Sequence, residues 1–332
     1  MAQVLSSNEM GSILDSPKKG SMRDAYGETL VRLGSELKDI VVIGADTTGS
    51  IKTSLFGQRF PERFFNVGIA ESNLVSVAAG LAMAGKIPFA STYAVFAPGK
   101  CVDQMRNAIA YPDVNMKLVA SHAGISVGPD GASHQELEDV ATMRAIPNMK
   151  IVIPSDPNST ARLIEILALN KGPYYMRIAR PDCPIIYSPA QASSILPGES
   201  MVLRDGSDIT VIACGLLVYE ALVAARRLAI ERQLNVRVLD MLSIKPIDET
   251  AILKAARETG SVVTAEEHNI IGGLGGAVSE VLSEKYPVLV RRVGTRDTFG
   301  ESGESIELMA KYGLTANNIV DKVVELVNLR RR

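Results

Sequence analysis

Short apolar segments alternate with longer amphipathic segments along almost the whole chain, and this alternation constrains the fold more than any other feature. Segments such as Ile40–Gly44 and Met116–Ser121 have the length and the apolar content of buried strands. Arg23–Leu37 and Asn158–Asn170 have the spacing of amphipathic helices. Strands that alternate with helices in this way are typical of parallel sheets covered by helices. The sequence therefore predicts an α/β protein with mainly parallel sheets flanked by helices.

Two consecutive α/β domains of this kind are expected. The chain has 332 residues, which is more than one average domain needs and enough for two domains with their own cores. Residues 188–207 are rich in Pro, Gly and Ser without regular apolar spacing, so they are interpreted as a linker. The predicted domains are therefore 21–187 and 208–332. Residues 1–20, which contain Ser and Gly, are expected to be extended or disordered.

Composition excludes several classes of protein. The apolar fraction of 46%, the charged fraction of 22% and the net charge of −2 are those of a globular protein, and Lys and Arg are scattered rather than clustered. A nucleic-acid partner and a membrane partner are therefore not expected. Cys101, Cys183 and Cys214 are widely spaced and show no metal-ligand pattern, which favours a reducing, cytoplasmic location.

The first candidate for chemistry is Glu71. It follows an apolar strand and a glycine turn, at the start of a helix of mostly small and apolar residues, within Asn66–Gly80. A helix start stabilises a carboxylate, but apolar neighbours such as Ile69 and Leu74 disfavour the charged form. An ordinary first-turn Glu explains this residue when the segment is considered alone. The alternative is a carboxyl group that shares a proton with a bound partner.

A second candidate is the glycine-rich loop within Ser121–Gln135. It contains His122, Asp130 and His134 just past the carboxyl end of a predicted strand, where open α/β sheets bind ligands. Histidines can orient and protonate the oxygens of a sugar near neutral pH, and glycines allow the backbone to approach a ligand closely. A solvated surface loop is the alternative, but two of the three histidines of the chain lie here. This concentration favours a ligand site.

Aromatic and basic residues lie at the ends of other predicted elements. Tyr93 and Phe96 stand at a strand end in a chain that is only 5% aromatic, and such rings either stack on a flat heterocycle or pack in the core. Arg23, Arg177 and Arg180 begin or end elements, and the planar guanidinium group is suited to binding phosphate. Each of these residues alone indicates little, because most aromatic residues pack in cores and most arginines lie on the surface.

Taken together in their order along the chain, these motifs resemble the pyrimidine-binding domain of transketolases. A later segment resembles the C-terminal domain of the same enzymes, so the resemblance covers nearly the whole chain after about Arg23. The motifs are Gly68-Ile69-Ala70-Glu71, Tyr93 with Phe96, Asp130-Gly131-Ala132-Ser133-His134-Gln135, Arg180-Pro181, Glu266-Glu267-His268-Asn269 and Gly272-Gly273-Leu274-Gly275-Gly276. The resemblance implies a thiamine diphosphate-binding fold followed by a transketolase C-terminal domain.

The resemblance also implies a cofactor, thiamine diphosphate, and the residues that contact it. Glu71 would hydrogen-bond the N1′ nitrogen of the pyrimidine ring, which favours the tautomer that deprotonates the thiazolium carbon. Phe96 would stack on the pyrimidine, with Tyr93 beside it. Asp46 would lie near the cofactor at a dimer seam, and Ile69 belongs to the same binding motif. Glu71 is therefore a catalytic candidate as well as a cofactor-binding one.

The substrate residues that the resemblance implies would bind a sugar phosphate. His134 is the second catalytic candidate, because it would contact sugar hydroxyls together with Asp130 and assist proton transfer. The other substrate-binding positions are Arg23, Ser50, His122 and Arg180. Gly99 departs from the family pattern, because transketolases usually have a third aromatic residue at this position. The pyrimidine pocket is therefore expected to be less enclosed, or completed by another segment.

The resemblance further implies a partner subunit. Transketolases hold the diphosphate and its metal through a Gly-Asp-Gly segment and a later Asn, and this sequence shows neither that element nor a cluster of hard oxygen ligands. The chain is therefore expected to be the C-terminal subunit of a split transketolase. A separate N-terminal subunit would hold Mg²⁺ or another divalent cation, in an α2β2 assembly. The complex would transfer a two-carbon ketol unit from a ketose phosphate to an aldose phosphate.

Three alternatives stay open at this point. A 1-deoxyxylulose-5-phosphate synthase shares much of the pattern but normally comes as one chain. The β subunit of 2-oxoacid dehydrogenases has the same two-domain size but lacks the loop with His122, Asp130 and His134. A non-catalytic nucleotide-binding protein would use Gly273-Leu274-Gly275-Gly276, which lacks the third glycine of a dinucleotide fingerprint. Assays of ketol transfer, pyruvate decarboxylation and NAD binding separate these alternatives.

Overall fold

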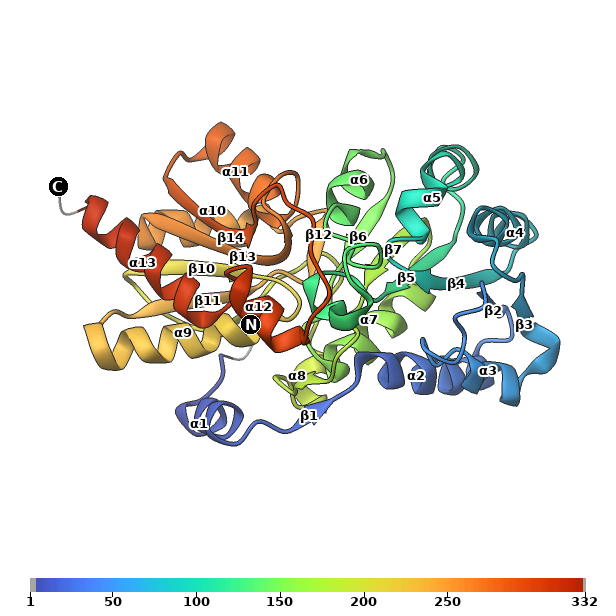
Figure 1. Cartoon of the computed structure of the whole chain (residues 1–332), viewed down its shortest axis with the longest axis horizontal. Coiled ribbons are helices and arrows are strands. Elements are labelled where there is room, and N and C mark those ends of the chain that lie inside the picture. Colours follow the sequence, from blue (N-terminus) through green and yellow to red (C-terminus); the bar gives the residue numbers. More distant parts are fainter. Residues whose placement is uncertain (1–3, 331–332) are drawn as a thin grey trace.

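Two helix-covered sheets form the body of the molecule and lie side by side along its longest axis (Figure 1). The computed structural model describes residues 4–330, so the start of the expected extended stretch, residues 1–3, lies outside the described part. The prediction of two α/β units with mainly parallel sheets is confirmed. Among the described residues, no helix combines the length and the apolar character needed to cross a bilayer.

Seven strands form the first sheet, namely β2 (Ile40–Gly44), β3 (Phe64–Asn66), β4 (Ile87–Tyr93), β5 (Lys117–Ser121), β6 (Lys150–Val152), β7 (Tyr174–Arg177) and β12 (Ser243–Lys245). Its helices are α2 (Met22–Glu36), α3 (Ser54–Arg59), α4 (Glu71–Met83), α5 (Ala97–Gln104), α6 (Asp139–Ala145) and α7 (Pro157–Leu169), and α5 continues as a π-helix over Met105–Ala110. The strand order is β12-β6-β7-β5-β4-β2-β3, and only β12 is antiparallel to its neighbour. Helices α4, α5 and α6 cover one face, and α2, α3 and α7 cover the other (Figure 1).

Five strands form the second sheet, namely β9 (Met201–Arg204), β10 (Ile209–Ala213), β11 (Val236–Asp240), β13 (Ser261–Asn269) and β14 (Leu289–Thr295). The helices of this half are α9 (Leu217–Arg232), α10 (Glu249–Thr259), α11 (Leu274–Lys285), α12 (Ser305–Lys311) and α13 (Ala316–Arg330). The strand order is β14-β13-β10-β11-β9, and only β9 is antiparallel. Helices α10 and α11 pack together on one face, and α9 and α13 pack together on the other (Figure 1).

The segment that the sequence marks as a linker is more structured than expected. Residues 188–207 contain helix α8 (Pro189–Ser193) as well as strand β9. The Ser188 side chain caps α8 by accepting a hydrogen bond from Gln191 N, and β9 pairs antiparallel with β11 at the edge of the second sheet. Elements of five and four residues are too short for apolar spacing to identify them.

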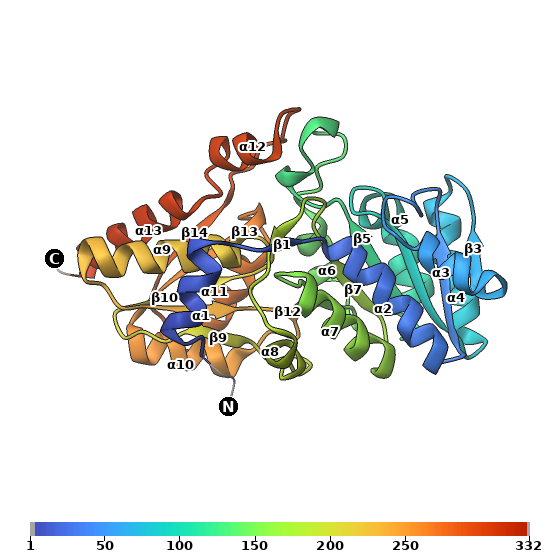
Figure 2. The same ribbon diagram turned by 90° about the horizontal axis from the view of Figure 1, so that it is seen from below.

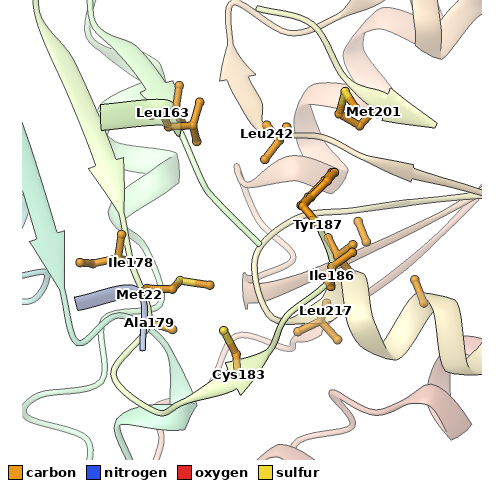
Figure 3. Packing of buried hydrophobic residues seen from close by; sticks show 14 of the residues in the cluster. Met22, Leu163, Ile178, Ala179, Cys183, Ile186, Tyr187, Met201, Leu217 and Leu242 are labelled. Atoms are coloured by element: carbon orange, nitrogen blue, oxygen red, sulfur yellow. The ribbon is translucent and has the colours of Figure 1, made fainter. Parts of the chain in front are cut away.

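The two halves of the chain share a sheet edge and a core. Strand β12 comes from the predicted second domain but pairs with β6 of the first sheet, with Ser243 opposite Val152. One cluster of buried apolar residues spans both halves. Figure 3 shows part of it, with Met22, Leu163, Ile178 and Ala179 on one side and Tyr187, Met201, Leu217 and Leu242 on the other. The division of the chain at 188–207 stays a prediction, because packing continues across it.

A buried carboxyl group also joins the halves. Asp240, at the end of β11, accepts hydrogen bonds from Ser155 Oγ at 2.5 Å and from the Tyr187 hydroxyl at 2.7 Å. Ser155 follows strand β6 of the first sheet. Burial raises the pKa of Asp240 to about 7, so the carboxyl group is protonated at mildly acidic pH, although the two hydrogen bonds that it accepts oppose this shift.

The N-terminal segment differs from its sequence prediction. Residues Ser7–Asp15 form helix α1, so the expectation of an extended or disordered stretch is wrong for this part. Ser6 and Glu9 cap the helix reciprocally, and Leu5 and Leu14 are buried. Leu5 N donates to the Leu203 carbonyl of β9 at 3.0 Å, so α1 packs on the second half of the chain. From there the chain crosses to α2 through β1 (Lys19–Gly20), which pairs with β8 (Cys183–Pro184) (Figure 2).

The carboxyl ends of the central strands meet at one edge of the first sheet. Gly44 of β2 lies opposite Ser91 of β4, and Tyr93 of β4 lies opposite Ser121 of β5. Because these strands are parallel, the loops that follow them emerge next to one another. Most of the residues that the sequence singles out stand in these loops.

Candidate active site

Glu71 is the first residue of α4 and is only 5% exposed. A tight turn precedes it, in which Gly68 adopts a φ of 74° and donates to Asn66 Oδ1 at 3.1 Å. Leu74, in the next turn of the helix, is fully buried. Among the described residues, the charged partner of Glu71 is Lys100, whose Nζ lies 3.3 Å from Oε2. The carboxyl group thus stands at a helix start, beside apolar side chains, with one oxygen next to an ammonium group.

Four rings cluster beside this ion pair. The Lys100 ammonium lies 4.5 Å from the centroid of the Phe96 ring. Tyr93 is inclined by only 19° to Phe96, with 5.8 Å between the centroids, and it stacks on His122 with 3.8 Å between the centroids. His134 stands edge-on to Phe96 at 5.4 Å. The structure therefore brings two aromatic and two histidine candidates, from the loops after β4 and β5, into one group.

A pocket of about 450 Å³ opens next to these rings. It combines two guanidinium groups, one imidazole, two hydroxyls and two carboxylates. The lining residues are Arg23, Ser50, Tyr93, His122, Asp130, Arg180, Pro181 and Asp182. Five of the six expected substrate residues thus line one pocket, and the sixth, His134, stands beside it against Phe96.

Backbone carbonyls fix both arginines of the pocket. Arg23 Nη1 donates to the Ser50 carbonyl at 2.8 Å, and Arg180 Nη1 donates to the Val127 carbonyl at 2.6 Å. Each guanidinium keeps further N–H groups for a ligand, because it has five donors in total. Two fixed cations in one small pocket favour an anionic group such as phosphate or sulfonate.

His122 is held in an unusual conformation as an uncharged ring. Its φ of 58° lies in the left-handed region, which residues other than glycine seldom adopt. Ser121 Oγ lies 2.7 Å from its Nδ1, which fixes the orientation of the ring. Burial, together with the positive charges of Arg23 and Arg180, lowers the pKa of His122 to about 3. At neutral pH the ring therefore offers a ligand a hydrogen bond rather than a charge.

The first prediction concerns this histidine. Because the pKa of His122 is lowered to about 3, the folded protein should keep the ring neutral from pH 8 down to pH 5. In the unfolded chain the ring titrates near 6.5, so protonation should favour unfolding as the pH falls below about 6.5. The measurement is an NMR titration of the three histidines, with His122→Gln used to assign the signal. A His122 signal that titrates between pH 5 and 8 would contradict the prediction.

Arg177, a phosphate-binding candidate from the sequence, does not line the pocket. It is buried and forms an ion pair with Asp139, with 2.9 Å between Nε and Oδ2. Its Nη2 also donates to the Glu267 carbonyl at 2.8 Å, which connects β7 to β13. Arg177 is therefore a structural residue at the junction of the two halves.

The second half of the chain also supports the glycine-rich loop directly. Glu267 Oε1 accepts a hydrogen bond from Ser126 N at 2.6 Å, and burial raises the pKa of this carboxyl group. Gly124, with φ of 88°, passes so close that an added Cβ would lie 2.2 Å from Glu267 Oε1. Gln135 Nε2 donates to the Glu301 carbonyl at 2.9 Å. In Figure 2, α12 lies against this loop. In the sequence Glu267 was noted only as part of a motif, and its hydrogen bond to the glycine-rich loop was not predicted.

Two expected cofactor residues, Asp46 and Ile69, lie away from the lined pocket. Asp46 is exposed, with φ of 61°, and its backbone N–H donates to Asn66 Oδ1 at 3.0 Å. Ile69 is 78% exposed. An added Cβ at Gly99 would have no atom within 4 Å, so the protein leaves space where a third aromatic residue was expected. The cofactor roles of Asp46 and Ile69 stay predictions.

The residues of the site suit an aromatic ring and an anionic group. A buried carboxyl group, a ring face and an edge-on imidazole suit a flat heterocycle with a basic nitrogen. Within residues 4–330, no three His, Cys, Asp or Glu side chains gather in a way that could hold a metal ion. The carboxylates that line the pocket, Asp130 and Asp182, stand with two arginines instead.

Two residues of the site escaped the reasoning from sequence. Lys100 follows Phe96 by four residues, a spacing that places two side chains on the same face of a helix. This spacing could have indicated that Lys100 lies next to the Phe96 ring. Asp182 follows Arg180 by two residues in an irregular segment, where spacing gives no such guide.

Known proteins share this order of domains. Residues 18–185 match the transketolase pyrimidine binding domain, and residues 198–319 match the transketolase C-terminal domain. The chain is 47% identical over 305 residues to a putative transketolase C-terminal section of Methanocaldococcus jannaschii, covering 92% of this chain and 95% of that protein. It is 39% identical over 312 residues to a 6-deoxy-6-sulfo-D-fructose transketolase subunit of Clostridium sp. (strain MSTE9), covering 93% and 96%. A solved split gene transketolase, described as an inactive β4 tetramer, is 50% identical with a TM-score of 0.87, covering 93% of this chain and 99% of that chain.

Proposed function

Because this chain belongs to the transketolase family, we propose that it is the C-terminal subunit of a two-chain, thiamine diphosphate-dependent transketolase. The complex would transfer a two-carbon ketol unit from a ketose phosphate to an aldose phosphate. One relative is named for a sulfonated ketose, and the paired guanidinium groups of Arg23 and Arg180 suit either anionic end group. The substrate class that we propose is therefore sugars with an anionic terminus.

The observation that carries this proposal is the continuity of the two parts of the site. Tyr93 lines the anion pocket and also stacks beside Phe96, whose ring lies next to the ion pair of Glu71. A sugar held by its anionic end at Arg180 would therefore extend toward the ring-binding part. Proximity of this kind is what a reaction between a bound cofactor and a sugar requires.

The residues of this chain would have distinct tasks. Thiamine diphosphate, when bound, supplies the electron sink for cleavage of a C–C bond next to a carbonyl. Glu71 would hold a proton at the pyrimidine nitrogen, and Phe96 would support the face of the ring. His122 would give an uncharged hydrogen bond to a sugar oxygen, which preserves the positive field of the arginines for the anionic end. His134, edge-on to Phe96, would move a proton at a sugar hydroxyl.

The remaining parts of the site are assigned to a partner subunit. The diphosphate and Mg²⁺ need hard oxygen ligands, and the described residues offer no cluster for a metal ion. We assign them to an N-terminal transketolase subunit, in an α2β2 complex. The free, buried cysteines Cys101, Cys183 and Cys214 support the expected cytoplasmic location.

Reconstitution tests the proposal. The chain is co-purified with an N-terminal transketolase subunit, thiamine diphosphate and Mg²⁺, and its mass is measured by light scattering. We expect two copies of each chain, ketol transfer between sugar phosphates, and no such activity with either subunit alone. Pyruvate decarboxylation or condensation of pyruvate with an aldose phosphate, without ketol transfer, would instead support a 2-oxoacid dehydrogenase or a deoxyxylulose phosphate synthase.

The second prediction tests the anion pocket. Arg180→Ala should raise the KM of the complex for a phosphorylated ketose by about 10- to 100-fold with little change in kcat, because it removes a charge-assisted hydrogen bond from the ligand. The KM for the same ketose without its phosphate should change by less than about threefold. Arg226→Ala, which removes the partly exposed partner of Asp15, is the matched control. An equal increase in KM for the phosphorylated and the unphosphorylated ketose would contradict the role of Arg180.

A further inference from the structure

Lys100 contacts the two groups that the pyrimidine ring would need. Its Nζ lies 3.3 Å from Glu71 Oε2 and 4.5 Å from the centroid of the Phe96 ring. The residue lies in the first turn of α5, four positions after Phe96, so its side chain reaches back over the face of that ring. The Lys100 side chain is 52% exposed and the Glu71 side chain only 5%. Of the two partners, the ammonium group is therefore the one that can move into solvent.

Both contacts stabilise the ammonium group where it stands. The Glu71 carboxylate attracts the ammonium group as an opposite charge at short distance, and the electron-rich face of the Phe96 ring attracts it as a cation. A flat ring that hydrogen-bonds Glu71 and stacks on Phe96 requires the same carboxylate edge and the same ring face. The ammonium group and such a ring therefore exclude each other.

We propose that Lys100 competes with the pyrimidine ring of thiamine diphosphate for Glu71 and Phe96, and that its side chain swings out when the ring binds. This inference rests on the proposed function and adds to it a determinant of cofactor affinity. The Lys100 side chain can move in this way because half of its surface is already exposed to solvent. The ammonium group should therefore weaken cofactor binding, and removing it should strengthen binding although Glu71 and Phe96 are unchanged.

The effect of this competition is measurable as an equilibrium constant. The experiment titrates thiamine diphosphate into the two-subunit complex at fixed Mg²⁺ concentration and measures Kd by calorimetry. Lys100→Met removes the charge but keeps the length of the apolar side chain. We expect it to lower Kd by about 5- to 30-fold, because the ring no longer has to displace an ion pair and a cation–π contact.

Two control variants separate this effect from a general loss of charge. Lys86→Met removes the partner of Asp39, a pair with 2.9 Å between its charged atoms. Lys86 is 42% exposed, close to the 52% of Lys100, and it lies before the start of β4, at the opposite end of this strand from Tyr93. This substitution should change Kd by less than about twofold, because an exposed pair contributes little. Lys100→Arg keeps the charge, and its Kd should stay within about threefold of the wild-type value or be higher.

Ionic strength provides a second readout. Salt screens the pair between Lys100 and Glu71, so the ratio of wild-type to Lys100→Met Kd values should fall below about threefold between 0.05 M and 0.5 M salt. Unchanged or weaker binding by Lys100→Met, with normal binding by the wild type, would overturn the inference alone. Absence of thiamine diphosphate binding by the wild-type complex would overturn the proposed function and the inference with it.

Discussion

Glu71→Gln is expected to lower the kcat of ketol transfer by a factor of about 10² to 10⁴, the usual contribution of a positioned proton-transfer group. The amide has the shape of the carboxyl group but cannot hold or return a proton at the pyrimidine nitrogen. The fold should survive, because Glu71 is the first residue of α4 and its partner Lys100 is half exposed and can turn to solvent. Steady-state kinetics of the two-subunit complex and a urea unfolding curve of this chain measure the two effects.

The chain contains a matched control for this substitution. Glu249 is also the first residue of a helix, α10, and it also pairs with a lysine, Lys285. Glu249→Gln therefore removes the same charge from the same helix position far from the rings, and kcat should change by less than about twofold. Normal turnover by Glu71→Gln would refute the role of this carboxyl group in proton transfer.

Arg177→Met is expected to lower the free energy of unfolding by about 3–5 kcal/mol, the cost of removing one partner of a buried ion pair. The Arg177 side chain is 8% exposed and that of Asp139 is fully buried. Without the guanidinium group, Asp139 keeps one hydrogen bond from the Tyr175 hydroxyl, at 2.6 Å, but loses its counter-charge. The Glu267 carbonyl also loses its donor, so the contact between β7 and β13 weakens. The midpoint of urea unfolding measures this loss.

Two further variants test whether the loss of stability comes from breaking a buried ion pair. Arg227→Met removes a pair with Glu231 whose side chains are 39% and 50% exposed, and it should cost less than about 1 kcal/mol. The double variant Arg177→Met with Asp139→Leu should recover part of the stability, because it leaves no unpaired charge of that pair in the core. A urea midpoint for Arg177→Met equal to that of Arg227→Met would show that the buried pair does not stabilise the junction.

Local sequence was sufficient for the long, regular elements and for several site residues. Ile40–Gly44 has the predicted bounds, and the bounds predicted for β5, α2 and α7 differ from the observed ones by one residue at one or both ends, because each segment has a strong apolar pattern. The grouping of His122, Tyr93 and Arg180 in one pocket follows the expectation that strand ends of a parallel sheet share an edge.

Elements that depend on contacts with distant parts of the chain were not predicted from the sequence. Strand β12 has three residues and takes its conformation from β6, more than ninety positions away along the chain. Helix α1 depends on a capping pair and on burial of Leu5 and Leu14. No periodic pattern reveals a three-residue strand or the burial of two leucines in a segment rich in Ser and Gly.

The sequence by itself determined the α/β architecture and the residue types gathered near the ends of the strands, because both follow from local patterns of apolar and polar residues. Only the tertiary structure decided that Arg177 and Glu267 join the two halves rather than bind a ligand, and that Lys100 stands between Glu71 and Phe96. The reason is physical: the partner of a buried charge and the position of an ammonium group over a ring depend on which distant segments pack together. Spacing along the chain does not contain that information.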